Sequence, residues 1–296
     1  MDNNRVVVFG SGGQLGVELL HEFTSRGYAV TGFERSAVDI SDAGRVEKTV
    51  AEIDPSIVLN AAAYNHVDVA ENEPIAAFQA NALAVRNLAM ACRQCDAKLV
   101  HYSTDYVFDG TAGRPYTEDD RPHPLGAYAV SKLAGELYAQ AYLDNPLIIR
   151  TSGVFGPGGL KTARGNFIET MLRQAHGGRK IRAVADYFAS PTYAPLLAAR
   201  TADLLERRQD GVFHVGGGAA ISWFEYARLI FQVAGLNPEL EPTDARQYRT
   251  AARRPKFSAL SNEKMERAGI APMPPLETAV RMYLDARARH FEAEPK

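Results

Sequence analysis

The sequence predicts an α/β protein with a doubly wound parallel sheet, and three observations support this class. Short apolar runs of strand length alternate with segments of helical periodicity through the first half of the chain. These runs are rich in Val, Ile and Leu, which is typical of parallel strands covered by helices on both faces. The first run ends in a turn, residues 10–16, in which four of seven residues are glycine.

The predicted elements follow in a regular order. Strands are expected over 5–10, 28–33, 56–63, 98–104 and 147–152, and helices over 13–27, 45–53, 74–95 and 127–143. After residue 152 the alternation loosens, although 182–186 and 211–215 still resemble strands. We therefore expect a first domain over 1–152 and a smaller second domain over 153–296, with some elements of the second returning to the main sheet.

Composition excludes several kinds of partner. The chain has 296 residues, with 33 basic and 35 acidic side chains and a net charge of −2. This balance predicts neither nucleic acid nor an anionic membrane as a partner. No apolar run approaches the roughly eighteen residues that would span a bilayer, and the first ten residues show no secretory signal. We expect a soluble cytoplasmic protein.

Cys92 and Cys95 are the only cysteines in the sequence, and both fall within a predicted helix. A zinc site needs about four ligands, and the pair lacks the strand-to-helix setting of a redox motif. We expect two structural thiols and no metal.

The glycine turn lies between a strand and a helix, which is the setting of a dinucleotide fingerprint. Its glycines are Gly10, Gly12, Gly13 and Gly16. Gly10 and Gly13 would let the backbone approach a pyrophosphate, and Gly16 would let the helix pack closely on the strand. The helix N-terminus adds N–H groups and a partial positive charge. The turn therefore predicts a Rossmann-like site for a dinucleotide.

The residues after the second predicted strand give opposite indications about which dinucleotide binds. Glu34 stands where a carboxylate could accept hydrogen bonds from a ribose 2′-OH, whereas Arg35 could receive a 2′-phosphate. Asp39 and Ile40 are expected to flank the adenine. The cofactor is therefore NADPH or NADH.

Tyr128 and Lys132 lie four residues apart on a predicted helix, so they share one face. A tyrosine is a poor acid near neutral pH, because its pKa is about 10. An ammonium about 4 Å away, at an effective dielectric near 20, is worth roughly 4 kcal/mol, which is about three pKa units at most. The pair therefore predicts general acid–base chemistry.

Ser103 and Thr104 stand where the strand 98–104 ends, at the carboxyl edge of the predicted sheet. A hydroxyl there could bind a substrate carbonyl while Tyr128 protonates it and a nicotinamide delivers hydride. Together, the glycine turn, the strand-end hydroxyl and the Tyr–Lys pair predict a reductase.

Several motifs resemble the extended short-chain dehydrogenase/reductases, and within them the dTDP-4-dehydrorhamnose reductase family. The resemblance extends over nearly the whole chain and rests on "GSGGQLG", "LNAAAYNHVDVAENEP", "HYSTDYVFDG", "YAVSKLAGE", "RTSGVFG", "NFIETML", "SPTYA" and "ARRPKFSAL".

The resemblance implies a role for particular residues. Thr104, Tyr128 and Lys132 would form the catalytic triad. Cofactor contacts would come from Gly10, Gly13, Gln14, Leu15, Ala61, Ala62, Ala63 and Tyr64. The nucleotide-sugar would be bound by Asp105, Phe108, Asn166 and Arg254, and the guanidinium of Arg253 or Arg254 suits phosphate oxygens. Asn166 could equally be a helix N-cap.

Two departures from the family pattern concern the sugar. The family usually has a tryptophan where this chain has Gly153, so an expected stacking surface is missing. Tyr187 or Phe155 could replace it, or the pocket could accept a different sugar. The segment before "SPT" also lacks the usual Gln and Gly.

Other functions remain open beside the reductase. A nucleotide-sugar epimerase is one, whereas a dehydratase lacks its second carboxylate because Tyr106 follows Asp105. A non-catalytic regulatory subunit, like that of methionine adenosyltransferase, would keep much of the same motif set. The expected partner is a nucleotide-sugar, and a homodimer is left open.

Two acidic patterns in the sequence are interpreted as structural. Glu71 and Glu73 are expected to favour a helix start electrostatically. Ser222 and Glu225 form a capping box, which makes "VGGGAAISW" a structural turn rather than a second phosphate loop.

Overall fold

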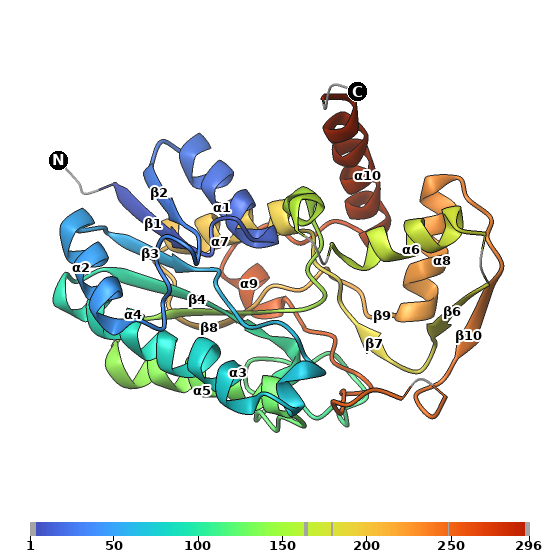
Figure 1. Ribbon diagram of the computed structural model, residues 1–296, viewed down its shortest axis with the longest axis horizontal. Helices are drawn as coiled ribbons and strands as arrows, with labels where there is room; N and C mark the ends of the chain where they lie inside the picture. Colours follow the sequence, from blue (N-terminus) through green and yellow to red (C-terminus); the bar gives the residue numbers. More distant parts are fainter. Residues whose placement is uncertain (1–3, 163–164, 179, 248, 294–296) are drawn as a thin grey trace.

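The computed structural model describes residues 4–162, 165–178, 180–247 and 249–293, and it contains the predicted parallel sheet (Figure 1). Six strands lie in the order β2-β1-β3-β4-β5-β8, and all neighbours in this sheet are parallel. Their bounds are Arg5–Phe9 (β1), Ala29–Phe33 (β2), Ile57–Asn60 (β3), Lys98–Thr104 (β4), Leu147–Thr151 (β5) and Gly211–His214 (β8).

Helices cover both faces of this sheet, as the apolar strands predicted. One face carries α1 (Gln14–Ser25) and α7 (Ala194–Glu206), and the other carries α2 (Ala43–Ile53), α4 (Ala84–Gln94) and α5 (Ala127–Tyr142) (Figure 1). Successive strand residues point to opposite faces. Val6 and Val8 therefore join the core under α1 and α7, whereas Val7 and Phe9 join the core under α2 and α4.

The strand order reverses at β1. From β1 the chain moves outward to β2, and it then returns to β3 on the other side of β1. In open α/β sheets, ligands bind at such a switch point, outside the carboxyl ends of the strands. The glycine turn follows β1 at this point.

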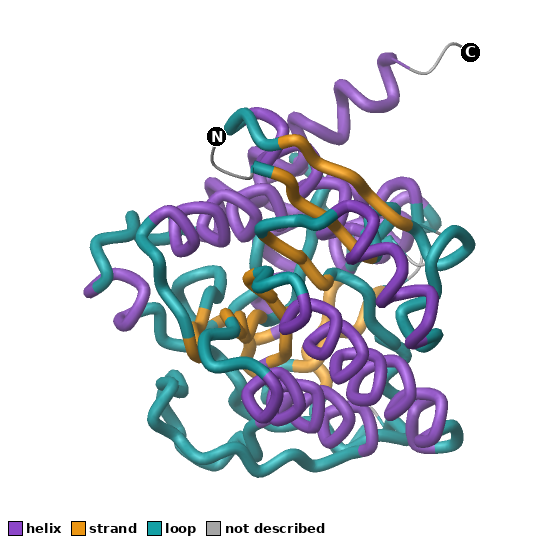
Figure 2. Tube along the Cα trace, turned by 90° about the vertical axis from the view of Figure 1, so that its left-hand side faces the viewer, coloured by secondary structure: helices purple, strands orange, loops and turns teal. Residues whose placement is uncertain are grey.

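A smaller part of the molecule lies beyond the carboxyl edge of the sheet (Figure 1). It contains α6 (Phe167–His176), α8 (Trp223–Ala234), α10 (Leu276–Ala293), a parallel pair of β6 (Ile181–Val184) and β10 (Leu240–Thr243), and an antiparallel pair of β7 (Phe188–Ala189) and β9 (Ile221–Ser222). These elements share a core of their own. Helix α10 projects from the body in both ribbon and tube views (Figures 1 and 2).

The segment after residue 152 does not stay in the smaller part. Helix α7 packs in the core with α1, and β8 pairs with β5 at the edge of the main sheet. The short helix α9 (Glu263–Arg267) also reaches this core through Met265. Of these elements β8 is a strand of the main sheet, and α7 and α9 pack against it.

The helix predicted over 74–95 is interrupted. It consists of α3 (Pro74–Phe78), a π-helical turn (Gln79–Leu83) and α4. A Cβ at Gly135 of α5 would lie 2.2 Å from the Asn81 carbonyl oxygen, so the π-helical turn packs directly against the backbone of α5. The Asn81 side chain donates to Ser131 at 3.0 Å. Turns of this kind often occur at functional sites, and this one contacts the helix that carries Tyr128.

Two further predictions concern cysteines and membranes. Cys92 is buried in α4, Cys95 is half-buried, and both are free thiols. Burial raises the pKa of the Cys92 thiol, so it is a packing residue and not a reactive one. Within the described ranges, no helix combines the length and apolarity needed to cross a bilayer.

Candidate active site

The glycine turn is shaped by contacts that exclude side chains. Gly10 has a φ of 78°, and a Cβ there would lie 2.6 Å from the Ala62 nitrogen. A Cβ at Gly16 would lie 2.1 Å from the Gly10 carbonyl oxygen, which is the close helix–strand packing expected of this position. Gly13 occupies the N-cap of α1 without a side-chain cap, so N–H groups of α1 can bind a phosphate.

Glu34 and Arg35, which gave opposite indications about the cofactor, have different surroundings in the structure. Glu34 extends over the turn, since a Cβ at Gly12 would lie 2.7 Å from its carboxylate oxygen. The guanidinium of Arg35 is bonded to Asp39 at 3.0 Å, and this side chain is 87% exposed. Bonds from the Ser41 N–H and from Arg35 lower the pKa of Asp39. The carboxylate of Glu34 therefore faces the site, while the charge of Arg35 is balanced by Asp39.

The loop after β3 borders the same turn. Ala61, Ala62 and Ala63 are half-buried, and Ala62 touches Gly10. The backbone of Tyr64 is bonded to the Asn81 side chain at 2.8 and 3.0 Å. Ile40, expected beside the adenine, instead has its side chain in the core under α2 and α4, because it completes the apolar face there. Leu15 also packs against the sheet core.

Tyr128 and Lys132 lie in the first two turns of α5, beside the end of β4. The Lys132 ammonium donates to the carbonyl oxygen of Tyr102 at 2.5 Å. Lys132 is 3% exposed, and burial lowers the pKa of its ammonium to about 8. The Tyr128 hydroxyl is 3.5 Å from the Asn65 side-chain oxygen. The pair predicted from sequence is thus held at the carboxyl edge of the sheet.

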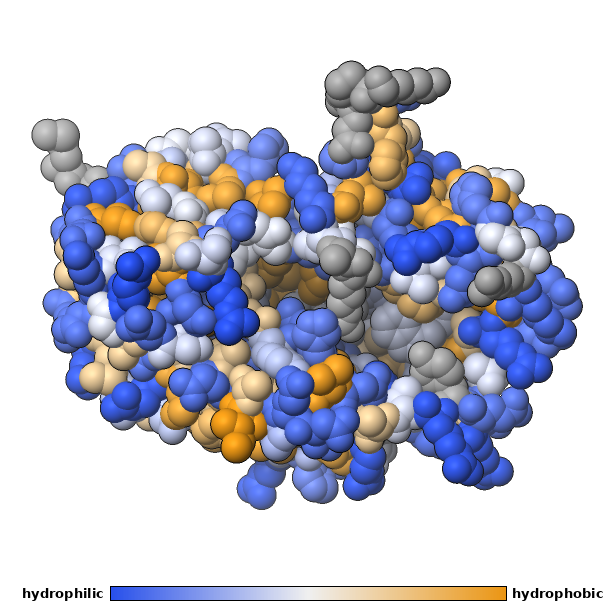
Figure 3. Space-filling view, viewed as in Figure 1, coloured by the Kyte–Doolittle hydropathy of each residue, from blue (hydrophilic) through white to orange (hydrophobic). Residues whose placement is uncertain are grey.

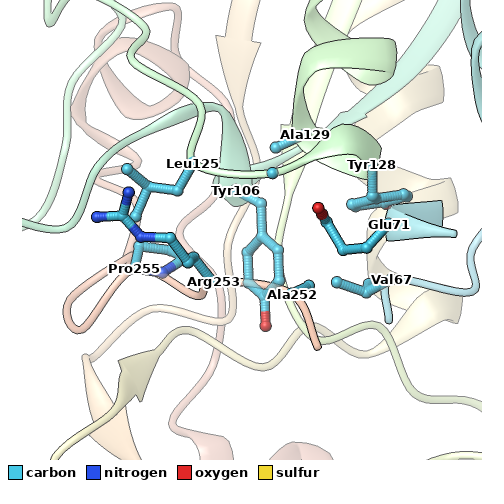
Figure 4. Close-up of a pocket in the computed structure, with 10 residues that line it drawn as sticks. Val67, Glu71, Tyr106, Leu125, Tyr128, Ala129, Ala252, Arg253 and Pro255 are labelled. Carbon is cyan, nitrogen blue, oxygen red and sulfur yellow. The ribbon is translucent and has the colours of Figure 1, made fainter. Parts of the chain in front are cut away.

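Tyr106 and Tyr128 line the same small pocket (Figure 4). Their rings meet edge to face, with centroids 6.3 Å apart. In Figure 4 Tyr106 stands between Arg253 and Tyr128. Tyr106 was not a predicted site residue, and only its place two residues after Thr104 could have suggested it.

Thr104 ends β4, and its hydroxyl oxygen accepts the Tyr106 N–H at 3.2 Å. The same hydroxyl donates to Asp105 at 3.2 Å. The second oxygen of Asp105 accepts bonds from Ser152 at 2.8 Å and Ser258 at 2.5 Å. The buried Asp105 carboxylate therefore connects the ends of β4 and β5 to Ser258. The sequence predicted that this carboxylate faces the sugar, but its oxygens are already bonded to these hydroxyl groups.

Ser103, the other strand-end hydroxyl, has a structural role. It donates to Glu136 of α5, and Glu136 also binds the Arg150 guanidinium at 2.7 and 3.0 Å. The side chains of Glu136 and Arg150 are almost fully buried. The ion pair connects α5 to β5, and the bond from Ser103 connects α5 to β4. Both contacts hold the helix that carries Tyr128 and Lys132 against the sheet.

Phe108 does not reach the substrate side. It is 0% exposed and stacks on Tyr116 with centroids 4.1 Å apart. The Arg150 guanidinium lies over its ring at 5.2 Å. The expected sugar contact is therefore incorrect for the Phe108 side chain, because that side chain belongs to a small core.

Asn166 is the N-cap of α6, which was one of its two predicted roles. Its side-chain oxygen accepts the Glu169 N–H at 3.1 Å, and its amide donates to Gln14 at 3.3 Å and Tyr283 at 3.1 Å. The Gln14 amide in turn donates to the Val154 carbonyl oxygen at 2.6 Å. The side chain of Gln14 thus ties α1 to the smaller part, leaving its backbone N–H for a phosphate.

The two arginines near the pocket differ in their surroundings. Arg254 forms a two-pronged ion pair with Asp68, at 2.7 and 3.0 Å. Arg253 is exposed and lines the pocket beside Tyr106 and Tyr128. Arg253 is therefore the more accessible cation for a diphosphate.

Glu71 caps the helix that carries Tyr128. Its carboxylate accepts the Ala127 N–H at 2.8 Å, and a Cβ at Gly126 would lie 2.6 Å from the same oxygen. The sequence predicted a helix start for this carboxylate, but the helix concerned begins 56 residues further along the chain. No local pattern identifies such a partner. Among the residues the structure describes, no cluster of His, Cys, Asp and Glu could hold a metal ion.

This sheet order, with a phosphate turn at its switch point and a buried Tyr–Lys pair beside it, defines a short-chain dehydrogenase/reductase, a nucleotide-dependent oxidoreductase. Residues 4–289 match the RmlD substrate binding domain family, and the chain belongs to that family.

Named relatives cover nearly the whole chain. It is 36% identical to the spore coat polysaccharide biosynthesis protein SpsK of Bacillus subtilis, over 96% of this chain and 98% of that protein. It is also 36% identical to dTDP-4-dehydrorhamnose reductase of Escherichia coli, over 95% and 97% of the two chains. The crystal structure of dTDP-4-dehydrorhamnose reductase from Bacillus anthracis in complex with NADP superposes with a TM-score of 0.91 at 34% identity, covering 96% of this chain and 99% of that one.

Proposed function

We propose that this chain uses NADPH or NADH to reduce the C4 ketone of a 4-keto-6-deoxy nucleotide-sugar, converting dTDP-4-dehydro-L-rhamnose to dTDP-L-rhamnose. The named relatives support this reaction. The observation that carries it is the bond from Lys132 to the Tyr102 carbonyl oxygen. That bond holds the Tyr–Lys pair at the end of β4, two residues before the Thr104 hydroxyl.

The glycine turn fits a dinucleotide pyrophosphate. Gly10 and Gly16 have no room for a Cβ, and Gly13 leaves the α1 N-terminus without a side-chain cap. A phosphate group would receive the N–H groups of Gln14 and Leu15 there. When bound, the nicotinamide supplies the hydride that adds to the sugar C4.

The remaining chemistry belongs to residues of this chain. The Tyr128 hydroxyl donates its proton to the ketone oxygen as C4 becomes tetrahedral, and the charge left on the phenolate is stabilised by the Lys132 ammonium. The Thr104 hydroxyl keeps its proton and orients the same ketone oxygen by a hydrogen bond, for which it must turn from Asp105 to the substrate. With a pKa of about 8, Lys132 is largely protonated at neutral pH.

The smaller part of the chain, built on α6, α8 and α10, holds the nucleotide end of the substrate in this proposal. The cleft between it and the sheet is visible as a hollow on the face shown in Figure 3. Arg253 supplies a positive charge for the diphosphate at the edge of this cleft.

The test is oxidation of NADH and NADPH, followed by absorbance, with enzymatically prepared dTDP-4-dehydrorhamnose. We expect turnover by the wild-type chain, and a loss of at least about 100-fold in kcat for Tyr128→Phe with cofactor affinity unchanged. Cofactor binding without any oxidation would contradict the proposal. Interconversion of sugars without net cofactor consumption would indicate an epimerase.

A further inference from the structure

Gly153 is an exposed position just after β5, the strand that neighbours β4 in the sheet. It follows β5, whose last residue Thr151 is paired in register with Thr104. Its neighbour Ser152 donates to Asp105, the residue after Thr104. Gly153 itself is exposed and has a φ of 50°. Position 153 therefore lies two residues after the strand partner of Thr104, at the same edge of the sheet.

The indole of Trp223 lies beside Gly153. A Cβ at Gly153 would lie 3.4 Å from Cη2 of Trp223, which is ordinary contact distance. Trp223 begins α8, so it reaches the end of β5 from the smaller part. It is half-buried and so keeps accessible surface. Since Gly153 has no side chain, the edge of the indole and Pro191 are the groups that lie beside its backbone.

The indole is held firmly in place. Its ring meets Phe167 edge to face, with centroids 4.8 Å apart, and lies 6.1 Å from the Tyr226 ring. Its backbone N–H donates to Tyr187 at 3.2 Å. Ser222 caps the helix by accepting the Glu225 N–H, which is the predicted capping box. A rigid aromatic side chain loses little conformational entropy on binding a ligand.

Of the two aromatic residues considered as replacements for the missing tryptophan, Phe155 is excluded. It is 1% exposed and packs against Tyr193 and Tyr283 in the core of the smaller part. Tyr187 is half-buried and contributes a backbone carbonyl to Trp223. Trp223 is therefore the aromatic ring that the geometry places against Gly153.

We infer that Trp223 is a specificity-determining residue, whose indole forms the apolar wall for the sugar of the bound nucleotide-sugar. The inference rests on the proposed function. A 6-deoxy sugar has a methyl group where other hexoses have a hydroxymethyl group, and an aromatic wall favours the methyl because no polar group must be desolvated. Gly153 follows the strand partner of Thr104, so this wall belongs to the sugar end of the substrate and not to the nucleotide end.

Trp223 is the single tryptophan of the chain, so its fluorescence reports on this wall directly. The first experiment titrates the wild-type protein with dTDP-rhamnose and, separately, with dTDP, while turnover of the keto sugar is assayed in parallel. We expect a change in emission with dTDP-rhamnose and a much smaller change with dTDP. Turnover without an emission change would overturn the inference alone. Absence of both turnover and emission change would overturn the proposed function and the inference together.

A second experiment distinguishes a role of Trp223 in sugar binding from a role in packing alone. Trp223→Leu should raise KM for the keto sugar by about tenfold, the value of one good aromatic contact, with a smaller change in kcat. Trp223→Phe should recover part of this loss. Phe291→Leu, which alters an exposed aromatic on α10, is the matched control and should change neither value. NADPH affinity should be equal in all variants, and an unchanged KM in Trp223→Leu would overturn the inference.

Discussion

Asp68 and Arg254 join two segments that are 186 residues apart in the chain, at 2.7 and 3.0 Å, directly beside the pocket that contains Tyr128. Asp68 follows β3, and Arg254 belongs to the C-terminal loop. Asp68 also accepts the Ala252 N–H at 3.1 Å, so one carboxylate positions both the backbone and the guanidinium of this loop. The edge of the pocket is thus assembled by an ion pair between the loop after β3 and the loop between β10 and α9.

The first prediction concerns this pair. Asp68→Ala should raise KM for the nucleotide-sugar a few-fold, because residues 252–254 lose the contacts that hold them beside Tyr128. Cofactor affinity should not change. Steady-state kinetics of Asp68→Ala, Arg254→Lys and the double variant would test the coupling. We expect the loss of substrate binding free energy in the double variant to be smaller than the sum of the losses in the two single variants. A lower KM in Asp68→Ala would show instead that Asp68 competes with the substrate for Arg254.

The second prediction concerns cofactor preference. The Glu34 carboxylate extends over the glycine turn, where it would repel a 2′-phosphate, whereas Arg35 is already paired with Asp39. We expect the wild-type chain to use NADH with the higher kcat/KM. Glu34→Gln should raise the NADPH-to-NADH ratio of kcat/KM by about tenfold, since a charge repulsion at short range is worth more than about 1.4 kcal/mol at an effective dielectric near 20.

Asp39→Asn is the companion variant. It removes the carboxylate that holds Arg35, so the guanidinium becomes available to a 2′-phosphate while Glu34 is unchanged. Asp39→Asn should raise kcat/KM for NADPH and leave kcat/KM for NADH close to the wild-type value. If neither variant shifts the ratio, the ribose does not lie between these two side chains.

Much of the fold was predictable because its signals are local. The alternating strands and helices follow from periodicity, and the glycine turn follows from contacts within one strand–turn–helix unit, since a Cβ at Gly16 would lie 2.1 Å from the Gly10 carbonyl oxygen. The Tyr–Lys pair is local as well, since four residues on one helix define a common face. Such features need no knowledge of distant contacts.

The missed features depend on partners that are distant in sequence. Glu71 caps a helix 56 residues away, Asp105 is bonded to Ser258 across 153 residues, and the π-helical turn at Asn81 packs against Gly135 of α5. Phe108 was misplaced for the same reason, since its motif indicates a loop near the substrate but not which way the ring turns. Pairwise contacts between elements decide these cases, and a single sequence does not encode them in any local pattern.

The third prediction concerns the buried Glu136–Arg150 pair. Arg150→Met should lower the free energy of unfolding by about 3–5 kcal/mol, because it leaves the Glu136 carboxylate buried without its counter-ion. Adding Glu136→Gln should recover much of this loss, since a neutral side chain needs no counter-ion and can still accept the bond from Ser103. Urea unfolding of the two variants measures both values. Equal stabilities of the single and double variants would contradict this account.

The fourth prediction concerns the pH dependence of stability. Burial raises the pKa of the Asp105 carboxyl to about 6, from 3.8, and bonds from Ser258, Ser152 and Thr104 only partly offset the effect of burial. Between these two pH values the native state holds a proton that the unfolded state has released. The contribution of Asp105 to stability therefore falls as pH rises from about 4 to about 6, by roughly 3 kcal/mol at most.

Asp105→Asn removes this titration while keeping a side chain of similar shape. The free energy of unfolding, measured in urea at several pH values, should show the wild type losing stability relative to Asp105→Asn across that window. Above it the difference should stay constant, because Asp105 is then ionised in both the native and unfolded states. Ser258→Ala serves as the comparison, since it removes one donor to the carboxylate and should extend the window to higher pH. Parallel curves for the wild type and Asp105→Asn would mean that this carboxyl titrates normally despite being buried.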